Sequence, residues 1–245
     1  MGIQTARGGG RRGVLFVHGT PGDQRSFDAV IARAPEGVRV HRFDLPDHGA
    51  APEEPEGRLA PLEDALVAAV ERTEGPLTLV GHSLGAWLAA SVDARLPSRV
   101  ERVVAIGGYP SLAADEVALR EGLLAQIEGG ALDVTADLRP IFLELMLGEA
   151  RTPALDERAW AQGGVSRERW VRLLKRMIEL GQRAPVRCSR PTRLLHGRRD
   201  AAVPYAHAVA LAAACVDAEL VPLDTSSHLL PLTHPEALAA HVFGA

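Results

Sequence analysis

A serine that could act as a nucleophile stands in the stretch LTLVGHSLGAW, residues 77–87. A short apolar run ends there in Gly-His-Ser-Leu-Gly, and an alanine-rich, helix-forming segment follows at once. Glycines on both sides of Ser83, at 81 and 85, would let a strand turn sharply into a helix and leave the serine oxygen exposed. A catalytic role also requires a base, an acid and oxyanion donors. Without them, Ser83 would be a polar residue in a structural turn.

His228 is our candidate for the base that accepts the serine proton. Histidine is the side chain whose ordinary pKa lies nearest neutrality. His228 follows the last expected strand, on a loop before the closing helix, which predicts a position at the carboxyl edge of a parallel sheet. His234 is the alternative, but it precedes Pro235 and is typical of a helix entry. His82 is expected to point away from the serine.

Asp200, in the stretch TRLLHGRRDAAVP, is our candidate for the acid that orients the imidazole. It follows another expected strand and should lie at the same edge of the sheet. Two alternatives remain open at this point. Asp200 could instead cap the helix that begins near Pro204 or pair with Arg198 or Arg199, and the acid could then be Asp224.

Two backbone N–H groups are expected to stabilise a developing oxyanion. One belongs to Leu84, at the start of a helix, and the other to Thr20, in the loop HGTPGD (18–23) after the first strand. Pro21 has no N–H group, which favours Thr20. The Thr20 hydroxyl could serve only the hydrogen bonding of its own loop. No spacing of His, Cys and Asp predicts a metal site, and no Gly-x-Gly-x-x-Gly follows a strand, so we expect neither a metal nor a cofactor.

Short apolar runs alternate with helical patterns along the chain, which predicts an α/β fold. It should be a doubly wound, mostly parallel sheet of about six or more strands, with helices on both faces. Strands are expected over residues 13–17, 38–43, 77–80, 100–106, 192–196 and 218–223, and helices over 25–34, 61–73, 84–96, 204–215 and 235–243.

One region interrupts this alternation. Residues 109–190 contain only helical and turn patterns, so we expect a helical cap inserted into a core formed by residues 1–108 and 191–245. Its apolar side chains could line a substrate pocket or pack the cap itself; the candidates for substrate binding are Phe142, Met146, Trp160 and Trp170. The arginines of the last cap helix are expected to form a solvated face, or alternatively to attract an anionic group; they are Arg167, Arg169, Arg172 and Arg176.

Composition excludes several classes of partner. The chain has 245 residues and a formal net charge of -4, without a long basic run, which argues against nucleic acid. No apolar stretch reaches the ~18 residues of a membrane helix, so no membrane partner is expected. Cys188 and Cys215 are interpreted as thiols rather than a disulfide, and the first dozen residues as a flexible lead-in. We therefore expect a cytoplasmic protein, either a monomer or a dimer.

Five motifs in this order resemble the α/β-hydrolase superfamily of esterases, lipases and thioesterases. They are VHGTPGD, FDLPDHGA (43–50), VGHSLG, LLHGRRDAAVP and the loop with His228, and the resemblance spans residues 13–245. It implies a catalytic triad of Ser83, Asp200 and His228, an oxyanion hole from Thr20 and Leu84, and a mobile lid at 109–190. Two features depart from the family pattern. In the loop FDLPDHGA, Asp47 replaces a glycine, and alanines stand at 50 and 51 where a serine is usual. In addition, only about a dozen residues precede the first expected strand, where relatives usually carry a β-hairpin.

The resemblance leads to one main hypothesis and three alternatives. The main hypothesis is a serine hydrolase that cleaves carboxylic esters or thioesters of small to medium apolar acyl groups through an acyl-enzyme at Ser83. Alternatives on the same triad are a hydrolase of carbon–carbon bonds and a peptidase that removes amino-terminal proline, because HGTPG is close to the His-Gly-Gly-Pro-Gly of that family. A ligand-binding protein with the same fold is the alternative that is not an enzyme.

Overall fold

The computed structural model describes residues 4–7, 12–163 and 166–244. A sheet of seven strands forms its centre, in the order β1-β3-β2-β4-β5-β6-β7. Six of these strands are parallel to one another: β2 (Arg12–Val17), β3 (Val38–Arg42), β4 (Leu77–His82), β5 (Val100–Ile106), β6 (Thr192–Gly197) and β7 (Ala218–Leu223). Each follows an expected strand to within two residues at either end, and the predicted fold class is confirmed.

The remaining strand, β1 (Gln4–Arg7), pairs antiparallel with β3 at the edge of the sheet. The interpretation of the first dozen residues as a lead-in is therefore wrong for residues 4–7, whereas residues 1–3 and 8–11 lie outside the described part. The sequence concealed this strand because QTAR contains no apolar alternation, and an edge strand with exposed residues needs none.

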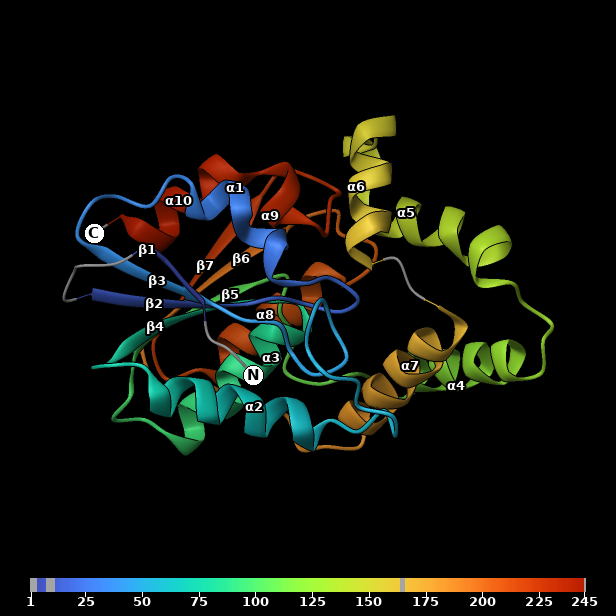
Figure 1. Cartoon of the computed structure of the whole chain (residues 1–245), viewed down its shortest axis with the longest axis horizontal. Helices are drawn as coiled ribbons and strands as arrows, with labels where there is room; N and C mark the ends of the chain where they lie inside the picture. The colour runs from blue at the N-terminus through green and yellow to red at the C-terminus, as the bar shows by residue number, and fades with distance from the viewer. Residues whose placement is uncertain (1–3, 8–11, 164–165, 245) are drawn as a thin grey trace.

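Helices cover both faces of the sheet (Figure 1). On one face lie α2 (Ala60–Arg72) and α3 (Leu84–Arg95), and on the other lie α1 (Asp28–Ile31), α9 (Leu230–Thr233) and α10 (Pro235–Phe243). A further helix, α8 (Tyr205–Ala214), packs on β6 and β7. The helix expected over 25–34 is shorter, because Asp23 caps a 3-10 turn (Gln24–Phe27) that precedes a single turn of α1.

Four helices lie between β5 and β6, to one side of the sheet in Figure 1. They are α4 (Ala114–Glu128), α5 (Arg139–Leu147), α6 (Pro153–Gly163) and α7 (Arg167–Gly181), with a π turn at Val134–Leu138. Apolar side chains from these helices join the same buried cluster as α2 and α3, so they have no separate core. Within the described residues, no helix is long and apolar enough to cross a membrane.

Candidate active site

Ser83 occupies a strained turn between β4 and α3. Its backbone has φ 53° and ψ −119°, outside the regions that residues other than glycine normally adopt. The turn is tight enough that a Cβ at Gly81 would lie 2.2 Å from the carbonyl oxygen of Gly85. A Cβ at Gly85 would lie 2.2 Å from the carbonyl oxygen of Val17 on β2. Both glycines are thus required by close backbone contacts, and the serine side chain is directed into a cavity at the carboxyl end of the sheet.

The structure brings Asp200 and His228 together at the same edge. Nδ1 of His228 donates to Oδ2 of Asp200 at 2.7 Å, and both side chains are almost fully buried. The other carboxylate oxygen accepts the N–H groups of Ala202 and Val203, each at 2.9 Å. Burial alone would raise the pKa of Asp200, but the charge and hydrogen bond of His228 outweigh it and hold the pKa below its ordinary value. An ionised Asp200 fixes the tautomer of His228, leaving Nε2 as the acceptor.

The alternative acid and base lie elsewhere. Asp224 is exposed and forms a surface ion pair with Arg199. His234 is the residue before α10, and its Nδ1 contacts the hydroxyl of Thr233 at 2.8 Å. Neither side chain lines the cavity that contains Ser83 and His228. Asp200 stabilises its own turn but does not cap α8, whose first residue is preceded by Pro204 without a side-chain cap, so the capping alternative is wrong.

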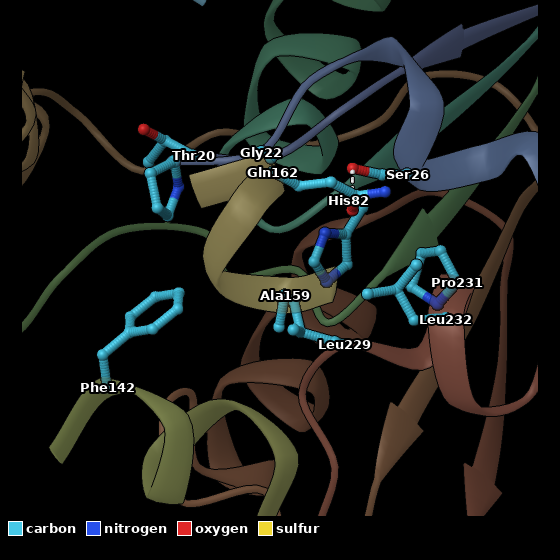
Figure 2. Close-up of a pocket in the computed structure, with 12 residues that line it drawn as sticks. Thr20, Gly22, Ser26, His82, Phe142, Ala159, Gln162, Leu229, Pro231 and Leu232 are labelled. Carbon is cyan, nitrogen blue, oxygen red and sulfur yellow. Dashed lines mark hydrogen bonds between the residues drawn. The ribbon is translucent and has the colours of Figure 1, made fainter. Parts of the chain in front are cut away.

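His82 supports the loop of His228 rather than facing Ser83. Its Nε2 donates to the carbonyl oxygen of His228 at 3.0 Å, and the two rings lie 4.9 Å apart. Burial, assisted by the nearby His228, lowers the pKa of His82 to about 3, so its ring is neutral. His82 lines a second, small cavity of about 20 Å³, in which Ser26 donates to Gln162 at 3.4 Å. Figure 2 shows these side chains. The two cavities share Thr20, Pro21 and Phe142 on their walls.

The loop of Thr20 packs directly against Ser83. A Cβ at Gly19 would lie 2.9 Å from the Cβ of Ser83, so the Gly19–Thr20 backbone reaches the nucleophile turn. The hydroxyl of Thr20 donates to Nε2 of His48 at 2.9 Å, since Nδ1 of His48 donates to a carbonyl oxygen. Neither Thr20 N–H nor Leu84 N–H donates to another protein atom in the described ranges. Both groups are therefore available as hydrogen-bond donors.

Asp47 holds α7 against the core. It adopts φ 69°, the left-handed conformation that a glycine would take. Its carboxylate accepts two hydrogen bonds from Arg172 (2.9 and 2.7 Å) and one from Arg176 (2.9 Å). Arg176 also reaches Glu54 at 3.1 Å, and its side chain is only 1% exposed. The expected solvated face is therefore wrong for Arg172 and Arg176, because helical periodicity cannot reveal carboxylates on a distant loop.

The cavity beside Ser83 has a volume of about 360 Å³, within the range of ~300–1,000 Å³ typical of small-molecule sites. Phe142, Met146 and Trp170 line it, as expected. Trp160 does not, which corrects that prediction. It stacks edge-on behind Phe142, with ring centroids 5.9 Å apart, and the guanidinium of Arg139 covers it.

Tyr109 is a site residue that the sequence analysis missed. It is fully buried, lines the cavity, and its hydroxyl contacts Sδ of Met177 at 3.8 Å. Burial raises the pKa of the Tyr109 phenol, and the positive charge of Arg120 opposes this shift. Its position just after β5, at the carboxyl end of a strand, was the available indication.

Comparisons with known proteins identify the family of the chain. The model of the alpha/beta hydrolase family matches residues 14–241. A pimeloyl-[acyl-carrier protein] methyl ester esterase of Aromatoleum aromaticum is 30% identical, over 94% of this chain and 96% of that protein. A protein of the same description from Neisseria meningitidis serogroup B is 29% identical, over 93% and 90% respectively. An esterase from Exiguobacterium antarcticum shares the fold, with TM-score 0.83 and 16% identity over 98% of this chain and 92% of that one. This chain belongs to the α/β-hydrolase family.

Proposed function

We propose that this protein hydrolyses carboxylic esters of small to medium, largely apolar acyl groups, with Ser83 as nucleophile. The observation that carries the proposal is the strained turn of Ser83, which opens into the same cavity as a buried His228–Asp200 pair. The names of the relatives support ester cleavage, because they are methyl ester esterases of an acyl-carrier protein. We extend the proposal to thioesters, which undergo the same acyl transfer.

The chemistry follows from the positions of the side chains. Ser83 attacks the ester carbonyl while Nε2 of His228 takes the hydroxyl proton, and Asp200 stabilises the resulting imidazolium. The N–H groups of Thr20 and Leu84 stabilise the oxyanion of the tetrahedral intermediate. Its collapse expels the alcohol, which receives the proton from His228 and leaves an acyl group on Ser83. A water molecule, deprotonated by His228, then attacks the acyl-enzyme and releases the acid.

The apolar wall of the cavity supports an acyl group of modest size. Most of its lining is aliphatic or aromatic, with Phe142 and Trp170 among the largest side chains. Burial of each methylene against such a wall contributes about 0.8 kcal/mol. In this proposal residues 109–190 form a cap that closes over the acyl group. We also propose a cytoplasmic location, with Cys188 and Cys215 interpreted as thiols of a reducing compartment.

A panel of p-nitrophenyl esters tests the proposal. We expect kcat/KM to rise with acyl length and then fall once the chain exceeds the cavity, and we expect Ser83→Ala to abolish turnover while the protein stays folded. A Ser83→Ala variant with wild-type turnover, or a wild-type protein that cleaves none of these esters, would overturn the proposal. Circular dichroism of the variant serves as the control for folding.

A further inference from the structure

Arg120, on α4, is a cation on the wall of the large cavity that has no carboxylate partner. It lines the same cavity as Ser83. Its Nη1 donates to the backbone carbonyl oxygen of Glu116 at 2.7 Å. Within the described ranges, no Asp or Glu oxygen lies within 4.0 Å of its guanidinium, although many other arginines of the chain are so paired. A guanidinium carries five N–H donors, so most of those on Arg120 remain available.

The carboxylate one helical turn before Arg120, that of Glu116, is engaged in other contacts. One of its oxygens accepts the N–H of Ala113 at 2.7 Å, which caps the start of α4. The other oxygen contacts Nε2 of His207 at 3.0 Å. The Glu116 carboxylate therefore binds the N–H group at the start of α4 and His207 on α8. The donors of Arg120, one helical turn further on, do not receive it as an anionic acceptor.

Tyr109 belongs to this polar region. Its ring centroid lies 6.2 Å from that of His207. Both Tyr109 and His207 line the cavity, as do Glu116 and Arg120. Tyr109, His207 and Glu116 are thus neighbours in this cavity, and Arg120 follows Glu116 by one helical turn. The rest of the lining is largely apolar, and it includes Leu112, Leu123, Leu138, Leu145 and Met177.

We propose that Arg120 forms a second subsite, which binds an anionic oxygen group at the end of the substrate remote from the ester. The inference rests on the proposed function, because it assumes that the scissile ester lies at Ser83. The planar guanidinium matches a carboxylate or a phosphate through two parallel hydrogen bonds. Apolar surroundings strengthen such a charged contact relative to water. The substrate class is therefore an ester whose acyl chain ends in a carboxylate or a phosphate, with an apolar segment between the two ends.

Three methyl esters with the same chain length test this subsite. Their far ends carry a methyl group, a carboxylate or a phosphate, so that the two charged esters distinguish the two sources of the anion. The quantity measured is the ratio of kcat/KM for a charged ester to kcat/KM for the neutral ester. We expect Arg120→Gln to lower this ratio about tenfold, and Arg120→Lys to lower it less, since lysine keeps the charge but not the paired donors.

Arg158→Gln is the matched control. Arg158 is exposed on α6 and does not line the cavity, and its replacement changes the net charge equally. We expect the ratio to stay within twofold of wild type in this control. An Arg120→Gln ratio within twofold of wild type, or an equal fall in both variants, would overturn the subsite.

A binding measurement separates this inference from the proposed function. In a Ser83→Ala background, the same esters are titrated while the fluorescence of Trp170 on the cavity wall is followed. We expect the Kd of a charged ester to rise about tenfold when Arg120→Gln is added, and that of the neutral ester to change less than twofold. Equal affinities for charged and neutral esters with Arg120 intact would refute the subsite. Absence of ester turnover in the wild type, with charge-selective binding retained, would refute only the proposed function.

Discussion

Replacing Asp47 by glycine tests whether α7 is held to the core by buried charge. Asp47 and Arg176 are 2% and 1% exposed as side chains, and Arg172 is 11% exposed. Glycine is the residue that the family pattern has at this position, and it relieves the left-handed backbone of φ 69°. In Asp47→Gly, the loss of two buried ion pairs lowers the stability of the protein, and the relief of backbone strain partly offsets this loss.

The magnitude follows from these two effects. Removing one partner of a buried ion pair costs about 3–5 kcal/mol, because the remaining charge is left uncompensated. The glycine backbone returns about 1 kcal/mol. Arg176 keeps its contact with Glu54, and Arg172 is exposed enough to reach water. Because both arginines keep another polar partner, we expect a net loss at the low end of this range, about 2–3 kcal/mol in the free energy of unfolding.

Urea unfolding followed by tryptophan fluorescence measures this loss, since Trp170 is on the same helix as both arginines. Glu53→Gln is the control, because Glu53 is 70% exposed and lies 3.9 Å from Arg172. We expect that change to cost less than about 0.5 kcal/mol. The arginine contacts hold the pKa of Asp47 below its ordinary value even though burial opposes them, so the difference between wild type and Asp47→Gly should be constant above pH 5. A variant as stable as the wild type would refute the reasoning.

Three further predictions follow from the site. Asp200→Asn should lower kcat by about 10³–10⁴-fold with little change in stability, because the group 2.7 Å from His228 loses its charge. Pre-steady-state kinetics with a p-nitrophenyl ester measures this loss of rate. A loss below tenfold would contradict the role of Asp200 as the acid of the triad. Gly85→Ala should destabilise the protein by several kcal/mol in thermal unfolding, because the new Cβ would lie 2.2 Å from a carbonyl oxygen. Gly122→Ala, in open space on α4, should instead stabilise it by about 0.5–1 kcal/mol. Equal effects of the two changes would refute the steric explanation. Burial lowers the folded pKa of both His48 and His82 to about 3, so between pH 6.5 and 5 these residues take up protons only in the unfolded chain. The free energy of unfolding should therefore fall by about 2 kcal/mol for each of them over this range. His82→Gln should reduce the slope of unfolding free energy against pH by one proton, and an unchanged slope would refute the prediction.

The sequence was sufficient to predict the sheet because burial on both faces leaves a pattern. Strands such as β2 and β5 each contain a continuous apolar run, VLFV and VVAI respectively. The edge strand β1 carries no such pattern and was missed. The first helix was predicted too long because the local pattern could not show where a 3-10 turn, fixed by the carboxylate of Asp23, would replace it.

At the site, residues that follow strands were easier to predict than residues that depend on tertiary contacts. Asp200 and His228 each follow a strand, so their meeting at one sheet edge could be anticipated. The ion pairs of Asp47 join a loop to a helix about 125 residues away, and no local pattern encodes that distance. For the same reason, the sequence could not tell that Trp160 lies behind Phe142 rather than beside the substrate cavity.

The central claim is that Ser83 is a nucleophile activated by His228. Labelling with a fluorophosphonate, followed by mass spectrometry of the digested protein, tests it most directly. The account predicts one adduct per chain, on the peptide that contains Ser83, and its loss in both Ser83→Ala and His228→Ala. A folded wild-type protein that acquires no adduct, or acquires it on another serine, would contradict the account.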